Sequence, residues 1–134
     1  MTTKKWKTVK EAAPEKAPAV LAGRRVINDE LFLAGWDHYD GEAVFDQLRV
    51  GQPVTLVREP GNKYDPNAIA VYWTPESGEG ERRKLGFIPR TSNGALALLV
   101  DDGSWDGKIV ASISKREISA NPWKRLAIKI EVEL

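Results

Sequence analysis

The last nine residues of the chain place the strongest constraint on its fold. Apolar side chains occupy every even position from Leu126 to Leu134, and Lys129, Glu131 and Glu133 alternate with them. A strict period of two is typical of a β-strand that has one face in a core and the other in water. The C-terminal segment therefore predicts a half-buried strand, which needs partner strands to form a sheet.

Five other segments predict the partner strands. Each is a short run with apolar and β-branched residues between turn-forming residues, a pattern typical of strands. They cover residues 29–36, 54–58, 68–73, 84–88 and 108–118. Gly86, within one of them, indicates a close backbone approach or a bulge. A shift of phase between Ser114 and Glu117 indicates a bulge or bend in another.

Two short helices complete the predicted elements. Residues 42–48 have apolar residues at helical spacing, with Asp40 as a candidate N-cap. Residues 94–101 show the same spacing and are followed by Gly103 as a stop signal. The N-cap candidates of this second helix are Thr91, Ser92 and Asn93. About six strands and two short helices predict a mainly β (α+β) fold, a small OB-like or SH3-like antiparallel β-barrel that is partly open.

Composition divides the chain into a tail and one domain. Residues 1–24 are rich in Lys, Ala, Glu, Pro and Thr, so we expect a disordered basic tail there and the barrel in residues 25–134. Residues 1–25 hold seven Lys and Arg against two Asp and Glu, a net charge of +5. Residues 26–134 hold thirteen against seventeen, a net charge of −4. A mildly acidic domain argues against a broad nucleic-acid surface, which is normally basic, but leaves room for a small site with few phosphate contacts.

The chain has no cysteine and a single histidine, His38. Disulfides and thiolate metal sites are therefore excluded, and a zinc site built from histidines is not expected. No apolar run approaches 18 residues, and no apolar stretch follows the N-terminal lysines. The sequence thus predicts neither a transmembrane helix nor a signal peptide. We expect a cytoplasmic monomer that needs no cofactor or metal ion and does not associate with membranes.

A loop between two predicted strands carries the candidate binding residues. It lies within residues 58–71 and is eight to nine residues long, which exceeds the usual length of a hairpin loop. Tyr64 and Asp65 stand at its centre, and Pro66 restricts the backbone of Asp65. A flat ring beside a hydrogen-bond acceptor is suited to recognise a ligand. The alternative is structural, with Asp65 in an Asx turn and Tyr64 packed on the barrel.

Four segments, in one order, resemble the HIRAN domain. The longest is Arg-Glu-Pro-x-Asn-x-Tyr-Asp-x-Asn-Ala-Ile-x-Val at residues 58–71. The others are Ala-Gly-Trp-Asp-His-Tyr at 34–39, Leu-Gly-Phe-Ile-Pro at 85–89 and the helix at 94–100. The resemblance covers residues 29–103 and implies an OB-like barrel, which the last two strands complete. HIRAN domains often sit beside helicase or RING modules, and neither pattern occurs here, so we expect a free-standing version.

The resemblance implies a site for the 3′-hydroxyl end of single-stranded DNA, as in the family member that is joined to a fork-remodelling helicase. Tyr64 matches the aromatic residue on which the terminal base stacks. Asp65 matches the carboxylate that accepts a hydrogen bond from the 3′-hydroxyl. Asn62 lies where the loop holds the end nucleotides, and Arg90 falls at a phosphate-facing position.

The wall opposite this loop departs from the family pattern at three positions. Asp37 stands in place of a basic phosphate contact, and Phe87 replaces a polar contact. His38 stands in place of a second stacking aromatic residue, with Tyr39 adjacent to it. We expect His38 and Tyr39 to line this wall, and the phosphate-binding side to be weaker than in the DNA-binding relative.

Charge and placement alone add Lys63 and Arg58 as candidate phosphate contacts, assisted by the basic tail. The run Arg82, Arg83 and Lys84 is either a solvated surface or the basic wall of a groove.

The leading hypothesis is a non-catalytic module that binds single-stranded DNA ends, with RNA ends left open and a DNA-repair or helicase protein as a candidate partner. One alternative is a protein-interaction module that adds a strand at the barrel edge. Another is a metal-dependent nuclease or phosphohydrolase. Its Mg²⁺ ligands would be Asp37, His38, Asp40 and Asp65.

Overall fold

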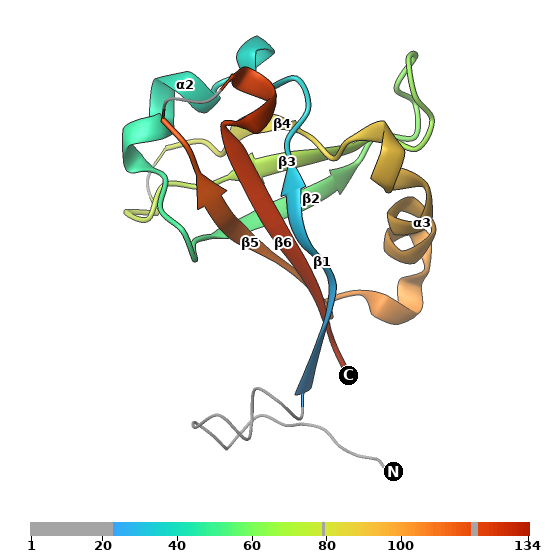
Figure 1. Cartoon of the computed structure of the whole chain (residues 1–134). Coiled ribbons are helices and arrows are strands. Elements are labelled where there is room, and N and C mark those ends of the chain that lie inside the picture. The colour runs from blue at the N-terminus through green and yellow to red at the C-terminus, as the bar shows by residue number, and fades with distance from the viewer. Residues whose placement is uncertain (1–22, 79, 119–120) are drawn as a thin grey trace.

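Six antiparallel strands form one sheet that curls into a partly open barrel (Figure 1). The computed structural model describes residues 23–78, 80–118 and 121–134, so residues 1–22 of the predicted tail lie outside the described part. The sheet order is β1-β6-β5-β2-β3-β4. The strands are β1 (Arg24–Phe32), β2 (Pro53–Arg58), β3 (Ile69–Trp73), β4 (Arg83–Phe87), β5 (Ile109–Arg116) and β6 (Leu126–Glu133). The predicted fold class is confirmed.

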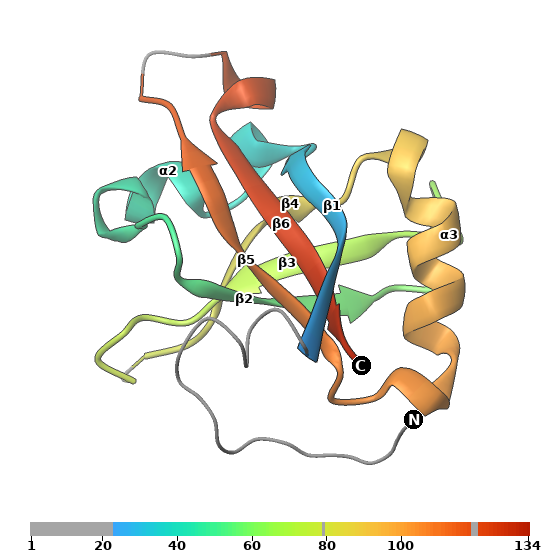
Figure 2. The same cartoon turned by 60° about the horizontal axis from the view of Figure 1, so that its bottom comes forward.

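Helical segments cover two sides of this barrel. Among the described residues, helices α2 and α3 lie on opposite sides of it in both views (Figures 1 and 2). Short 3-10 turns lead into or follow the main elements. The helical elements are η2 (Trp36–His38), α2 (Gly41–Val44), η3 (Phe45–Gln47), α3 (Arg90–Asp101), η4 (Gly103–Trp105) and η5 (Pro122–Lys124). In the described part of the chain, no helix is long and apolar enough to cross a membrane.

Strand β6 lies at the centre of one half of the sheet, between β1 and β5. Its alternation is confirmed, because Ile128 and Ile130 are fully buried while Lys129 and Glu131 remain partly exposed. Burial of each isoleucine contributes roughly 1.5–3 kcal/mol, as an upper estimate. The predicted irregularity in β5 is also confirmed, since its pairing with β6 skips Ser114.

An isolated bridge joins the two ends of the sheet. Ala34, just after β1, exchanges two backbone hydrogen bonds with Phe87 at the end of β4, with N···O distances of 2.8 and 2.9 Å. The preceding residue, Gly86, makes this approach possible, because a Cβ atom there would lie 2.6 Å from the carbonyl oxygen of Ala34. The predicted close approach at Gly86 is confirmed, and a bulge at Leu85 accompanies it.

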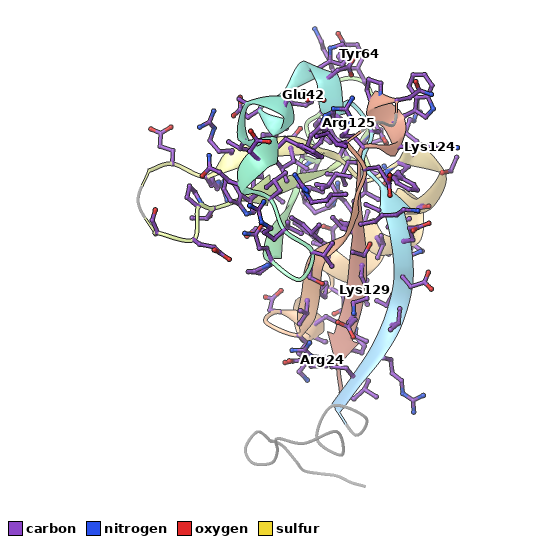
Figure 3. The ribbon with its side chains drawn as sticks, turned by 60° about the vertical axis from the view of Figure 1, so that its left-hand side comes forward. Arg24, Glu42, Tyr64, Lys124, Arg125 and Lys129 are labelled. Carbon is purple, nitrogen blue, oxygen red and sulfur yellow. The ribbon has the colours of Figure 1, made fainter. Side chains whose placement is uncertain are left out.

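A buried tryptophan ties the first helical segments to the rest of the barrel. The Trp36 side chain is buried, and its indole N–H donates to Glu42 Oε2 at 2.6 Å. The same oxygen accepts from Arg125, which precedes β6, at 2.5 Å. Figure 3 shows Glu42 and Arg125 side by side at this end of the molecule. The segment around η2 is therefore fixed to β6.

The first strand begins and ends earlier in the chain than the sequence pattern predicted. A strand was expected over residues 29–36, but β1 begins at Arg24 and ends at Phe32. Residues 24–27 are exposed and show no alternation, so their extended form depends on pairing with β6. The guanidinium of Arg24 adds an ion pair with Glu133 at 3.1 Å. Gly35, with a φ of 71°, turns the chain into η2.

The expected N-cap residues of the second helix are wrong, whereas that of the first helix is confirmed in its position. Helix α3 begins at Arg90 rather than at residue 94, and the N-cap residue is Pro89, which offers no side-chain hydrogen bond. Asp40 does occupy the N-cap position of α2, yet its side chain caps no backbone N–H. Its carboxylate instead accepts from Arg83 Nε at 3.2 Å. At α2, an ion pair with Arg83 thus takes the place of a local side-chain cap.

Replacement of Gly86 by alanine should destabilise the barrel, because the new methyl group would clash with the Ala34 carbonyl. We expect the free energy of unfolding to fall by about 1–3 kcal/mol, the usual cost of overpacking. The measurement is urea unfolding followed by tryptophan fluorescence. Gly94→Ala is the matched control, since it adds a methyl group in open space on α3 and should leave stability equal or about 0.5–1 kcal/mol higher. Equal stability of the two variants would contradict the role of Gly86.

Candidate functional site

Three segments far apart in sequence line a cavity of about 260 Å³ beside the bridge that closes the barrel. They are residues 34–39 around η2, residues 62–68 of the long loop, and residues 87–93 at the end of β4 and the start of α3. Six of the eight predicted site residues line it. They are His38, Tyr39, Asn62, Tyr64, Asp65 and Arg90.

The long loop is held in shape by Asn62. Its side-chain oxygen accepts from the backbone N–H groups of Tyr64 and Asp65, at 2.9 and 3.1 Å. Its amide nitrogen donates to Glu59 Oε1 at 3.1 Å. The backbone of the loop is therefore held at Tyr64, and this residue is 77% exposed. The ring does not pack on the barrel, so that part of the structural alternative is wrong.

Asp65 occupies the floor of the cavity and is only partly exposed. Its Oδ1 accepts from the backbone N–H of Asn67 at 2.9 Å, which is the Asx turn of the structural alternative. Its Oδ2 accepts from Asn93 Nδ2 at 2.8 Å and lies 3.7 Å from Arg90 Nε. The hydrogen bonds from Asn93 and from the backbone of Asn67 lower the pKa of Asp65, aided by the charges of Arg90 and Arg58. A carboxylate has about four acceptor positions, so the ionised group can still accept another donor.

Asn93 is the site residue that sequence reasoning missed. It was expected only as a helix cap, but it lies within the first turns of α3 and is 3% exposed. A buried polar side chain needs a partner, and this partner is Asp65. Asn93 stands three positions after the Gly-Phe-Ile-Pro-Arg run, so the sequence did mark its neighbourhood as part of the candidate site. Local patterns could not show its pairing with Asp65, because the two residues are 28 positions apart.

Two aromatic rings, Tyr39 and Phe87, form a second wall of the cavity. Tyr39 and Phe87 meet edge to face, with ring centroids 5.6 Å apart. The Tyr39 ring also covers Gly35, where a Cβ atom would lie 3.3 Å from it. His38 stands at the rim with its imidazole largely exposed, and its Nε2 is 3.8 Å from Asp37 Oδ1.

Two predicted phosphate contacts do not line the cavity. Arg58 makes a bidentate pair with Asp101 on α3, at 2.9 and 3.1 Å, and donates to two carbonyl groups of the loop. Its guanidinium thus fastens the loop to α3. Lys63 lies over the Tyr64 ring, with its Nζ 5.2 Å from the centroid. Arg90 differs, because its side chain lines the cavity and is 77% exposed.

A second exposed ring stands near this site. Trp123 on η5 is 62% exposed, and η5 packs against η2, which carries His38. Tyr64 and Lys124 lie toward the same end of the molecule, away from Arg24 (Figure 3). Sequence reasoning assigned Trp123 no role, because nothing local connects it with residues 36–38.

The residues of the alternative metal site do not converge. Asp40 pairs with Arg83, and Asp65 pairs with Asn93. Within residues 23–78, 80–118 and 121–134, no group of three or more His, Cys, Asp or Glu side chains is arranged to hold a metal ion.

Comparisons with known proteins agree with this architecture. A family model described as the HIRAN domain matches residues 29–134. A solved protein from Lactobacillus plantarum is 29% identical, with a TM-score of 0.58 over 83% of this chain and 97% of that chain. The HIRAN domain of human HLTF is 20% identical, with a TM-score of 0.51 over 84% of this chain and 78% of that chain, a likeness of fold. No curated protein matches.

Removal of the Asn93 amide should raise the pKa of Asp65 toward its ordinary value of 3.8, because the largest cause of the lowering is lost. The folded-state pKa is depressed, so the ionised carboxylate stabilises the fold above about pH 3.8, and this contribution is lost as the pH falls through the folded pKa. The measurement is a carboxyl ¹³C NMR titration of Asn93→Ala. Asn67→Ala is the control, since it keeps the backbone N–H and should leave the pKa unchanged. An unchanged pKa in Asn93→Ala would refute this account.

Proposed function

This chain belongs to the HIRAN domain family, and on that premise we propose that it is a non-catalytic module that binds single-stranded DNA at a free 3′-hydroxyl end. The observation that carries the proposal is the pairing of an exposed Tyr64 ring with the ionised Asp65 carboxylate in one cavity. At about 260 Å³, the cavity lies just below the volume range of small-ligand sites, which begins at roughly 300 Å³. That size suits one terminal nucleotide.

Tyr64 supports the proposal through stacking. A terminal base has one free face, and base–aromatic stacking contributes about 1–3 kcal/mol per base. Tyr64 is held by the Asn62 hydrogen bonds, so little ordering is required on binding. Tyr39 and His38 line the same cavity from another segment, and we assign them the second contact surface for the base.

Asp65 gives the proposed site its preference for an end. A carboxylate accepts a hydrogen bond from a 3′-hydroxyl but repels a 3′-phosphate, so one residue both attracts the right end and rejects the wrong one. The lowered pKa keeps this group ionised at neutral pH. Its existing hydrogen bonds to Asn93 and Asn67 fix its direction.

The phosphate side of the proposed site is small. Arg90 is the exposed cation that lines the cavity, while Arg58 is paired with Asp101, and Asp37 adds negative charge beside His38. The exposed indole of Trp123, next to η2, offers a stacking surface for a further base. We therefore assign recognition mainly to rings and one carboxylate, and only in small part to charge.

The end preference can be measured by fluorescence anisotropy with labelled oligonucleotides that carry a 3′-hydroxyl or a 3′-phosphate. Wild-type protein should bind the 3′-hydroxyl strand more tightly, and Asp65→Asn should erase the difference because the repulsive charge is gone. Asp106→Asn removes the same charge from an exposed turn and should keep the preference.

Salt dependence provides a separate check on the size of the site. Each neutralised phosphate of a single strand contributes about −0.7 to the slope of log K against log salt. A slope that implies six or more phosphates would contradict a small end-binding pocket. If neither strand binds at low salt, a protein partner becomes the leading ligand class.

Replacement of Tyr64 by alanine should weaken binding of the 3′-hydroxyl strand roughly 5- to 150-fold, which corresponds to the loss of about 1–3 kcal/mol of stacking. Tyr64→Phe keeps the ring and should bind within about twofold of wild type, because the proposal gives the hydroxyl group no role. Both variants should unfold like wild type, since the ring is largely exposed. Equal affinities of the alanine and phenylalanine variants would rule out stacking on this residue.

A further inference from the structure

Lys84 does not line the cavity, but its ammonium group contacts Tyr39 and Phe87, which do, and Glu59, which accepts from Asn62 of the cavity lining. It belongs to β4, and its side chain is 22% exposed. Its ammonium group is 2.9 Å from Glu59 Oε2. Of the basic run at residues 82–84, Arg82 stacks on Tyr72 and Arg83 pairs with Asp40. Lys84 alone among these three reaches both walls.

One set of contacts connects Lys84 to the loop that presents Tyr64. Glu59 accepts from Lys84 with Oε2 and from Asn62 with Oε1. Asn62 in turn accepts from the backbone N–H groups of Tyr64 and Asp65. Burial raises the pKa of Glu59, but the hydrogen bonds from Lys84 and Asn62 and the charge of Lys84 outweigh it, so the pKa is lowered. Each contact in this series, from Lys84 to the backbone of Tyr64 and Asp65, is a hydrogen bond that involves a charged or an amide group.

A second set of contacts connects Lys84 to the opposite wall. Its Nζ lies 4.8 Å from the centroid of the Tyr39 ring and 4.4 Å from that of Phe87. A cation this close to an aromatic face is attracted by the ring quadrupole. The backbone carbonyl of Lys84 also accepts from the N–H of Asp40 at 2.9 Å. Lys84 therefore holds the segment that carries Tyr39 by its side chain and by its backbone.

We propose that Lys84 is a positioning residue that sets the distance between the Tyr64 wall and the Tyr39 wall of the DNA-end site. The inference rests on the proposed function. Its charge acts inside the protein, through Glu59 and the two rings, and makes no contact with phosphate. Loss of the ammonium group frees Glu59 from its cation and lets both walls relax, so the gap that receives the terminal base is no longer preformed.

Lys84→Met tests this role, because it keeps the aliphatic stem and removes the charge. We expect the 3′-hydroxyl strand to bind about 5- to 10-fold more weakly. This is the loss of affinity that follows when only about a tenth to a fifth of the DNA-free protein has the preformed site. Lys84→Arg can restore both contacts and should bind close to wild type. Lys108→Met loses the same charge beside the C-terminal end of β6, away from the cavity, and should bind like wild type. If Lys84→Met binds like Lys108→Met, the proposal is overturned.

Two further measurements separate positioning from a general loss of stability. A double-mutant cycle of Lys84→Met with Asn62→Ala should be non-additive, because both act through Glu59. In the DNA-free protein, Lys84→Met should shift the amide signals of Tyr64 and Asp65 and the ring signals of Tyr39 in NMR spectra. Additive effects together with unmoved signals would overturn the proposal. If wild type binds no DNA end, the proposed function fails, and the NMR comparison decides the role of Lys84 by itself.

Discussion

The architecture depends on two backbone hydrogen bonds between Ala34 and Phe87. They join the ends of a six-stranded sheet that is otherwise open, and they form only because Gly86 has no side chain in their way. Residues on both sides of this bridge line the cavity. The contact that joins the ends of the sheet therefore also brings the two sides of the cavity together. A change that breaks this bridge would also move the walls of the cavity apart.

Ionic groups around the cavity are largely satisfied within the protein. Arg58 is paired with Asp101, and Lys84 is paired with Glu59. These pairs fasten the long loop to α3 and to β4, so their charges stabilise the shape of the site. Removal of one partner of such a pair would leave the charge of the other partner uncompensated. The groups that remain to contact a ligand are the exposed rings, Asp65 and Arg90.

Sequence reasoning predicted those features that local patterns encode. The alternation in β6, the bulge at Ser114 and the close approach at Gly86 each follow from residue type and spacing, and the structure confirms them. The start of β1 was wrong because its pairing with the distant β6 decides it, and the start of α3 was wrong because the helix begins directly after Pro89, without a side-chain cap. Arg58 was expected at the ligand, yet its partner Asp101 stands 43 positions away and takes up its charge. No local signal encodes such a pairing.

The scarcity of unpaired positive charge near the cavity has a kinetic consequence. Oppositely charged partners can associate at 10⁸–10⁹ M⁻¹s⁻¹ by steering, whereas neutral surfaces reach roughly 10⁵–10⁶ M⁻¹s⁻¹. From the first residue of β1 onward, residues 24–134 hold fifteen Lys and Arg against seventeen Asp and Glu, a net charge of −2, so the barrel would not draw a polyanion from a distance. Capture of a strand end would then be limited by the rate of correct encounters, so the concentration of ends in its immediate surroundings would determine how often the pocket is filled.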